Sequence, residues 1–233
     1  MSVGGIADPP EKTLAERIYN QLRRDILVGS LEPGRKLRFE YLRERYEAGM
    51  STFRESLARL AADGLVIAEG QRGFRVAAVS LADLWDVTRL RQKMETLALQ
   101  RAIEIGDDGW EAEIVAAYHR LSKLKDPRSG RLTLLGEEPL LRHRAFHFSL
   151  IAACDSPWTM RFVSTLYDHS ERYRRFSTLR ASAPRDTDGE HQALMQAALG
   201  RDAKTATRLL VDHLEQTARV VTSLSASWDP AGR

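Results

Sequence analysis

Cysteine and long apolar segments are scarce in this sequence, and each scarcity excludes a class of protein. The one cysteine, Cys154, excludes an intrachain disulfide and a metal site built from several thiolates. No apolar run approaches the ~20 residues that span a bilayer, and the first residues lack the basic-then-apolar pattern of a secretory signal. We therefore expect a cytoplasmic protein that has no membrane partner.

Charge is nearly balanced overall but is unevenly placed along the chain. Residues 11–77 hold 13 Lys and Arg against 10 Asp and Glu, whereas residues 78–233 hold 22 against 21. The small basic excess of the front part is compatible with a polyanionic partner. We expect tails at 1–10 and 225–233, a domain at 11–77, a linker at 78–80 and a second domain at 81–224.

The front part has the pattern of a helix-turn-helix followed by a small hairpin. Apolar spacing and turn residues predict three helices and then two β-like pieces, which the polar tip Glu-Gly-Gln-Arg-Gly joins. Ser51 is expected to cap the third helix, with Glu55 in its first turn. This order is typical of a winged helix-turn-helix, in which one helix enters the major groove of DNA. The expected helices span about 13–28, 39–46 and 51–64, and the β-like pieces span 65–68 and 73–76.

Candidate DNA contacts lie at the start of the third helix and at the tip of the wing. Ser51 and Thr52 are short donors suited to phosphate, and Arg54 is a fork that fits guanine or phosphate. A helix N-terminus itself attracts phosphate. Gln71 and Arg72 lie at the wing tip, between two glycines that let the backbone approach closely.

The front part resembles a known family. The segments LVGSLEPGRKL, FRESLARLAADGLV and EGQRGFRVA are similar to the DNA-binding domain of the GntR family of bacterial regulators. The resemblance implies that double-stranded operator DNA is the partner and that Arg54 contacts it. Glu40 and Met50 stand where relatives often have Arg, and Arg38 is a candidate to compensate for Glu40. The operator sequence therefore does not carry over from relatives.

The back part is helical throughout and predicts an all-α antiparallel bundle, so we expect a mainly α protein. Gly, Pro and Asp residues separate six segments of helical periodicity. These span about 81–105, 110–125, 137–154, 158–179, 189–199 and 200–224.

Four of the six histidines of the chain have a spacing in this bundle that would suit a metal site. His143 and His147 are four apart in one helix, so their side chains stack on one face. His191 and His213 lie in two later helices, and packing of the helices as a bundle would let all four converge. Imidazole is a common metal ligand.

A second resemblance covers this part of the chain. HRAFHFSLIAACDSP and EHQALMQAALGRDAKTATRLLVDHL are similar to the FadR-type C-terminal domain of the same family, called FCD. In its metal-binding members an Asp precedes the first His by four residues. Here His147, His191 and His213 match the His positions, and His143 stands in place of the Asp. The resemblance implies three His ligands, and the role of His143 stays open.

Arg91 in the first helix of the bundle matches an Arg that often lines the effector pocket of such domains. The resemblance implies that it contacts an effector carboxylate, whereas its spacing from Glu95 favours a pair within the helix. The aromatic residues Tyr167, Tyr173 and Phe176 are expected to pack in the bundle rather than to line a pocket.

The donor set restricts the metal. Imidazole ligands favour Zn, Ni, Fe or Cu and disfavour Ca or Mg, so we expect a divalent transition metal, Zn first, with Ni or Fe as alternatives. Four protein ligands would close a structural tetrahedral site, whereas a larger shell would leave room for a small carboxylate. We favour the larger shell, because the resemblance to FCD domains implies an effector pocket. Four neutral imidazoles would leave a charge of +2 on the site, which attracts an anionic effector.

The leading hypothesis is a homodimeric transcriptional regulator, a repressor, whose operator binding responds to a small carboxylate metabolite bound at the metal. One alternative is a regulator for which the ion itself is the signal. Another is a metal-dependent enzyme with a DNA-binding head. The sequence has neither a His-Glu-x-x-His motif nor a Glu-x-x-His pair, and Glu190 is the only general-base candidate next to the histidines. We therefore expect no enzymatic activity.

Overall fold

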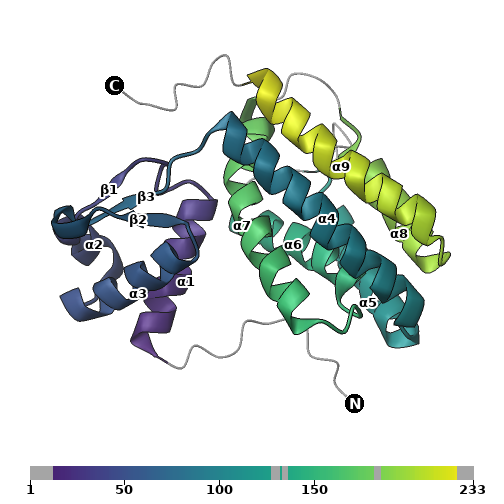
Figure 1. The fold of residues 1–233 in the computed structure, drawn as a ribbon, viewed down its shortest axis with the longest axis horizontal. Coiled ribbons are helices and arrows are strands. Elements are labelled where there is room, and N and C mark those ends of the chain that lie inside the picture. The colour runs from purple at the N-terminus through teal and green to yellow at the C-terminus, as the bar shows by residue number, and fades with distance from the viewer. Residues whose placement is uncertain (1–12, 127–131, 133–135, 181–184, 225–233) are drawn as a thin grey trace. The chain divides into compact units, whose positions relative to one another are not determined.

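The computed structural model describes residues 13–126, 132, 136–180 and 185–224 of the 233-residue chain. The chain divides into two compact units, and the boundary between them falls between Ser80 and Leu81. Helices dominate both units, and one small sheet lies in the first (Figure 1), so the expectation of a mainly α fold is confirmed. The expected tails at 1–10 and 225–233 lie outside the described residues.

The first unit consists of three helices and a three-stranded antiparallel sheet. Strand β3 lies between the other two strands, so the order in the sheet is β1-β3-β2. The elements are α1 (Leu14–Leu27), β1 (Lys36–Leu37), α2 (Phe39–Tyr46), α3 (Met50–Ala62), β2 (Val66–Ala68) and β3 (Phe74–Val76).

The helices of this unit end and pack for identifiable local reasons. Thr13 caps α1, because its hydroxyl accepts a hydrogen bond from the backbone N–H of Glu16. The start expected for the third helix is wrong: Gly49 takes the N-cap position and α3 begins at Met50. Ser51 is therefore already helical, which leaves its hydroxyl exposed at the first turn.

The hairpin forms where the β-like pieces were expected, but the sheet has one more strand. Lys36 and Leu37 form a short strand that pairs with Arg75 and Phe74 of β3. Two residues carry too little periodicity to signal a strand. The wing tip contains a short 3-10 turn over Gly70–Arg72, and Gly73 closes it with a φ of 93°, a region that favours glycine.

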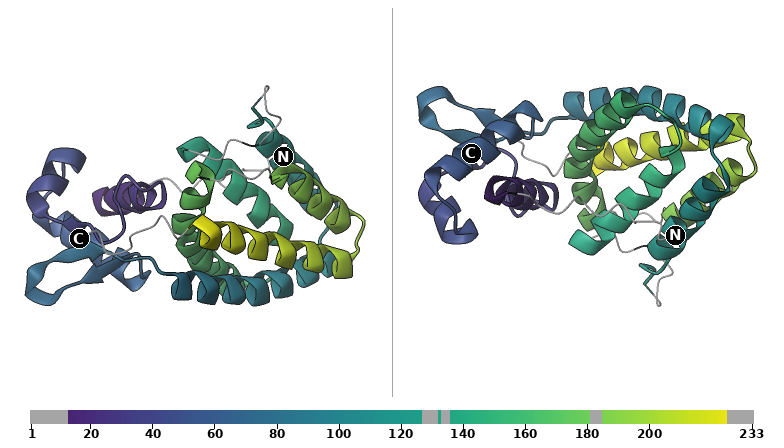
Figure 2. Two further views of the ribbon diagram at one scale, coloured as in Figure 1. Left: turned by 90° about the horizontal axis from the view of Figure 1, so that it is seen from above. Right: turned by 90° about the horizontal axis from the view of Figure 1, so that it is seen from below.

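The described part of the second unit contains six helices (Figure 2). Helix α4 packs against α7 and α9, while α5 packs against α6 and α8. The six helices are α4 (Leu81–Ile105), α5 (Asp108–Ser122), α6 (Glu137–Ile151), α7 (Pro157–Arg180), α8 (Thr187–Leu199) and α9 (Ala203–Leu224). None of the described helices has the length and apolar character needed to cross a bilayer.

Several helix ends in this unit differ from the expected ones. Helix α5 starts two residues early because the carboxylate of Asp107 accepts from the N–H of Trp110. Helix α8 starts at Thr187 because Asp186 caps it in the same way, through Gly189. Asp is a strong N-cap, so in both cases the capping Asp sets the first residue of the helix.

A continuous apolar core holds the six helices together. Leu99, Ile114, Phe146, Leu150 and Leu194 come from four different helices and are all nearly inaccessible to solvent. Burial of each such side chain contributes roughly 1.5–3 kcal/mol. This core fixes α6, α8 and α9 relative to one another, and these are the three helices that carry the four histidines.

Candidate functional site

An aromatic contact joins the start of α2 to the first turn of α3 in the front unit. The rings of Phe39 and Phe53 lie 6.5 Å apart, and the guanidinium of Arg54 lies 6.0 Å from the centre of the Phe39 ring. Arg38 directly precedes Phe39 and is exposed. Two of the predicted DNA-contacting residues, Arg38 and Arg54, therefore flank the same helix–helix junction.

The start of α3 is open to an anionic partner. Gly49 provides no side-chain cap, and the first turn contains no acidic residue, so Glu55 does not lie in it as expected. Ser51 is exposed and Thr52 is half-buried. The free N–H groups and the helix dipole at this end attract phosphate.

Basic side chains gather at the wing. Arg72 is exposed, and the side chain of Gln71 lies outside the described part of the structure. Arg75 hydrogen-bonds Glu69 and lowers its pKa, and the charges of Lys36 and Arg72 act in the same direction. Sequence reasoning missed Lys36, because it lies on the unexpected strand β1, whose pairing brings it beside Arg75.

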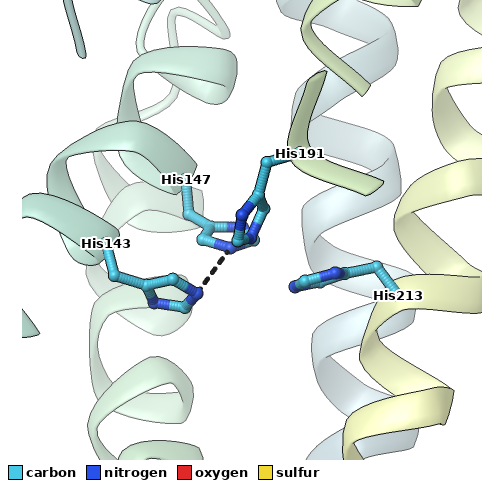
Figure 3. A group of neighbouring side chains, drawn as sticks. All are labelled: His143, His147, His191 and His213. Carbon is cyan, nitrogen blue, oxygen red and sulfur yellow. Dashed lines mark hydrogen bonds between the residues drawn. The ribbon is translucent and has the colours of Figure 1, made fainter. Parts of the chain in front are cut away.

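The four histidines of the second unit converge, as Figure 3 shows. His143 and His147 come from α6, His191 from α8 and His213 from α9. All four side chains are buried. One nitrogen from each ring can be chosen so that all four atoms lie within 4.8 Å of one another. The group could therefore hold a metal ion.

The nitrogens of the four rings differ in how well they are paired. The Nε2 atoms of His143 and His147 lie 3.2 Å apart, so two bare lone pairs would oppose each other unless a proton or a cation lies between them. Within the described part of the structure, Nδ1 of His147 and both nitrogens of His191 are buried without a hydrogen-bond partner. Such atoms are costly to bury, and metal ligation would satisfy one of the two nitrogens of His191.

Burial lowers the pKa of all four histidines, and their neighbours add to the effect. Desolvation is the largest cause at His143, His147 and His191, followed by repulsion from another histidine of the group. At His213 desolvation outweighs the opposing hydrogen bond to Glu190. The imidazoles are therefore neutral near pH 7, which is the form that binds metals.

Two of the histidines have partners on the side away from the cluster. Nδ1 of His143 lies 2.7 Å from the hydroxyl of Tyr167; Tyr167 is buried in the bundle as expected, and this hydroxyl contact was not predicted. Nδ1 of His213 lies 2.7 Å from Oε2 of Glu190. Glu190 in turn accepts two hydrogen bonds from Arg185, at 2.7 and 2.5 Å.

Tyr173 is buried in the bundle as well. Its buried ring places the hydroxyl 2.5 Å from Asp83 of α4, which ties α7 to the start of α4. The side chain of Phe176 lies outside the described residues.

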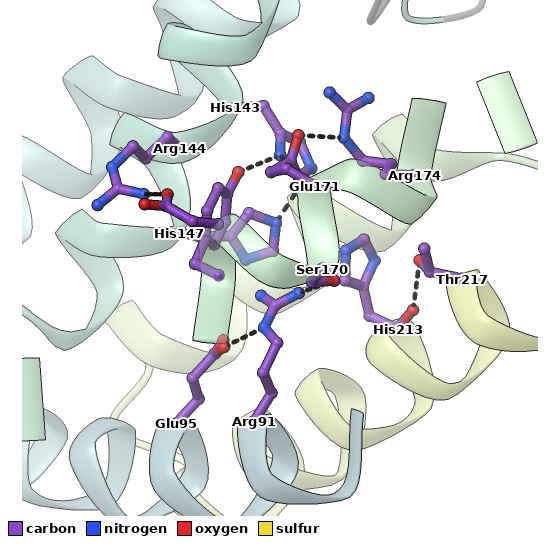
Figure 4. Close-up of polar contacts among 12 residues, drawn as sticks. Arg91, Glu95, His143, Arg144, His147, Ser170, Glu171, Arg174, His213 and Thr217 are labelled. Atoms are coloured by element: carbon purple, nitrogen blue, oxygen red, sulfur yellow. Dashed lines mark hydrogen bonds and ion pairs between the residues drawn. The ribbon is translucent and has the colours of Figure 1, made fainter. Parts of the chain in front are cut away.

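Arg91 is buried beside the cluster (Figure 4). It donates to Glu95 at 2.6 Å and to the hydroxyl of Ser170 at 2.8 Å, and its guanidinium lies 5.0 Å from the centre of the Tyr167 ring. Burial alone would lower its pKa, but the charge and hydrogen bond of Glu95 outweigh burial and raise it. The pair with Glu95 predicted from spacing is present, and Arg91 nevertheless faces the cavity.

A cavity of about 70 Å³ adjoins the histidines. Its wall includes the four histidines and three arginines, each paired with a carboxylate: Arg91 with Glu95, Arg174 with Glu171 and Arg185 with Glu190. The remaining polar lining residues are Glu171 itself, Ser170, Thr187 and Thr217. Sequence reasoning missed Arg174 and Arg185, because a single Arg on a helix or in a loop is most often a solvated surface charge.

Comparison with known families matches both units. Residues 14–76 match the family "Bacterial regulatory proteins, gntR family", and residues 86–216 match the "FCD domain". The first match covers the helix-turn-helix and the wing, and the second covers all four histidines.

Similar proteins with known names are regulators. The chain is 41% identical over 210 residues to the "Uncharacterized HTH-type transcriptional regulator BphR" of Paraburkholderia xenovorans, which covers 90% of this chain and 86% of that protein. It is 37% identical over 200 residues to the "HTH-type transcriptional repressor GlaR" of Escherichia coli, covering 84% and 90%. The solved structure of E. coli McbR/YncC superposes with a TM-score of 0.74 at 19% identity, covering 93% and 99%, which shows a common fold.

The winged head, the helical second unit and these relatives define a DNA-binding transcriptional regulator and not an enzyme. The chain belongs to the GntR family of bacterial regulatory proteins and carries a C-terminal FCD domain, as in the FadR subfamily. Its GntR head implies DNA binding, and its FCD domain implies binding of a small-molecule effector.

Proposed function

We propose that this regulator is a homodimeric repressor whose operator binding responds to a small carboxylate bound at a metal centre in the FCD domain. The observation that carries the proposal is the convergence of four buried histidines beside a cavity lined with arginines. A relative 37% identical to the chain is named a repressor, which supports the direction of regulation.

On the DNA, the start of α3 would read the major groove while the wing follows the backbone. Arg54 is the candidate for a bidentate contact with guanine. Ser51, Thr52 and the helix start would hold phosphate, and Arg38 lies on the other side of the junction. Arg72, together with Gln71, would contact DNA from the wing tip.

In the second unit, His143, His147, His191 and His213 would hold one divalent transition ion, with Zn first and Ni or Fe as alternatives. Such an ion supplies a Lewis acid to which a carboxylate oxygen can bind. The four neutral imidazoles leave the full +2 charge on the site, and a carboxylate would offset part of it.

Arg91 is the candidate for the second contact with the effector. Its guanidinium already donates to Glu95 and Ser170, but it lines the cavity and keeps its positive charge. An Arg fork binds a carboxylate through two parallel hydrogen bonds. The size of the cavity, about 70 Å³, favours a small acid.

The test begins by selecting a binding site from a pool of random duplex DNA with the full chain. Operator affinity is then measured for Zn-loaded protein across a series of small mono-, di- and hydroxy-acids. A coupling free energy of about 1–3 kcal/mol would change the affinity roughly 5–150-fold for the right acid. Unchanged affinity with every acid, together with no thermal stabilisation by any of them, would contradict the proposal.

The metal-sensor alternative has one observation in its favour, namely that four protein ligands are enough to close a tetrahedral site. If the ion is the signal, removal of metal changes operator affinity and acids have no effect. If the acid is the signal, the Zn-loaded protein responds to an acid.

A further inference from the structure

The four histidines differ on the side that faces away from the cluster. Nδ1 of His213 bonds the carboxylate of Glu190 at 2.7 Å, and Nδ1 of His143 bonds the hydroxyl of Tyr167 at 2.7 Å. Among the described residues, Nδ1 of His147 and both nitrogens of His191 have no partner. His213 is thus hydrogen-bonded to a carboxylate and His143 to a phenol, with the Glu171 carboxylate farther off, at 3.9 Å from Nδ1 of His143. His147 and His191 have neither kind of partner.

This difference decides which ring nitrogen carries the proton. A neutral imidazole has one N–H, and only the other nitrogen can bind a metal. An ionised carboxylate accepts hydrogen bonds and never donates them, so Glu190 fixes the proton of His213 on Nδ1 and turns the lone pair of Nε2 towards the cluster. A phenol can donate or accept, so Tyr167 does not fix the proton of His143.

Glu190 is itself held in place. Arg185 donates to both of its oxygens, at 2.7 and 2.5 Å, and also donates to the backbone carbonyl of His213 at 2.9 Å and to Thr217 at 2.8 Å. One guanidinium therefore joins the first turn of α8 to α9. The carboxylate cannot rotate away from His213 without breaking this set of contacts.

We propose that Glu190 is the positioning residue of the metal centre, which sets the proton of His213, and that Arg185 keeps Glu190 in that position. The inference rests on the metal centre proposed above. Glu190 also lies in the first turn of α8, where an acidic residue stabilises the helix dipole. That structural role would affect folding stability and leave metal binding unchanged, so the two roles can be separated.

The experiment uses the full chain after metal removal. Zn²⁺ affinity is measured by competition with a chromophoric chelator, and Co²⁺ is added separately to record its d–d absorption bands, which depend on the ligands. We expect Glu190→Ala to weaken Zn²⁺ binding about 10–100-fold, as loss of a carboxylate behind a ligand His usually does, and to change the Co²⁺ spectrum. Glu190→Gln should retain more affinity, because its amide oxygen still accepts from Nδ1.

Glu111→Gln is the matched control. Glu111 also lies in the first turn of its helix and pairs with an arginine from another segment, Arg201, but it is absent from the histidine cluster. Its substitution should lower stability by a similar small amount and leave both metal measurements at their wild-type values.

Wild-type Zn²⁺ affinity and an unchanged Co²⁺ spectrum in both Glu190 variants would overturn the inference and leave the metal centre standing. Failure of the wild-type protein to bind either ion would instead overturn the metal centre, and the positioning role with it. Circular dichroism and thermal unfolding verify that each variant is folded. If Glu190→Ala does not fold, the measurements on Glu190→Gln still decide the question.

Discussion

The residue proposed to contact a DNA base, Arg54, lies at the junction of α2 and α3. Arg54 is exposed and lies over the ring of Phe39, so its side chain is partly ordered before DNA binds. A guanidinium held in this way loses less conformational entropy on contact with a base. The motif predicted Arg54 from the sequence, whereas its support by Phe39 depends on the packing of two helices.

Arg54→Ala should weaken binding to the selected operator by about 1–3 kcal/mol, because a bidentate guanine contact contributes about that much discrimination. Fluorescence anisotropy at fixed salt measures the loss. Arg59→Ala is the control, since Arg59 lies on the same helix but over the ring of Tyr19. Equal affinities for wild type and Arg54→Ala would remove α3 from the recognition surface.

The sequence predicted the members of the histidine cluster but not all of their contacts. Spacing placed His143 and His147 on one face, and the resemblance assigned His191 and His213, all of which lie together in the structure. The role of Tyr167 escaped prediction, because an aromatic residue in an amphipathic helix is usually part of the core. Nothing in the sequence shows that its hydroxyl meets a ring nitrogen from another helix.

At the scale of elements, the cluster depends on α6 being held between its neighbours. Phe146 lies between the two histidines of α6 in sequence, and its ring contacts those of Tyr118, His147 and His191. It is fully buried. The apolar face of α6 therefore supports both the core and the side chains of the histidine cluster.

Phe146→Ala should destabilise the chain by about 3–5 kcal/mol, because it removes a buried ring and leaves a cavity. Phe162→Ala is the matched control: this ring is 53% exposed, and its loss should cost within about 0.5 kcal/mol. Urea unfolding of the metal-free proteins measures both. Similar free energies of unfolding for the two variants would contradict the assignment of Phe146 to the core.

Helices with several turns of apolar periodicity could be predicted from the sequence. Elements or ends that depend on a contact of one or two residues could not. Helices α2 and α4 have the expected bounds, because their apolar stripes and flanking turn residues agree. Strand β1 was missed, since its two residues are defined by pairing with β3. The start of α3 was misplaced, because Ser51 is the better cap by composition but the turn after α2 puts Gly49 at that position.

For the whole molecule, a two-fold symmetric protein requires a two-fold symmetric operator. We expect the selected DNA sites to contain inverted half-sites, and sedimentation of the full chain to give a dimer. A monomer that binds a single asymmetric site would contradict the homodimer proposal.

Stability of the metal-free chain should depend on pH through the buried histidines. Their pKa values are lowered below the ordinary 6.5 in the folded state, so below about pH 6.5 the unfolded chain binds more protons. Stability is therefore complete above that pH and falls as the pH drops, by at most about 1.4 kcal/mol per pH unit for each histidine. Urea unfolding with a chelator at pH 7.5, 6.5 and 5.5 measures the slope, which should be smaller in His147→Ala/His213→Ala. An identical slope in that variant would assign the dependence to other groups.

The proposal that the four histidines hold one metal ion is tested by measuring the metal content per chain. The untagged protein is expressed in medium with trace metals, purified without chelators and measured by elemental analysis. We expect one divalent transition ion per chain in the wild type and almost none in His147→Ala/His213→Ala, with both proteins still binding the selected operator DNA. A wild type without metal, or a variant that keeps one ion per chain, would contradict the assignment of the four histidines as the metal centre.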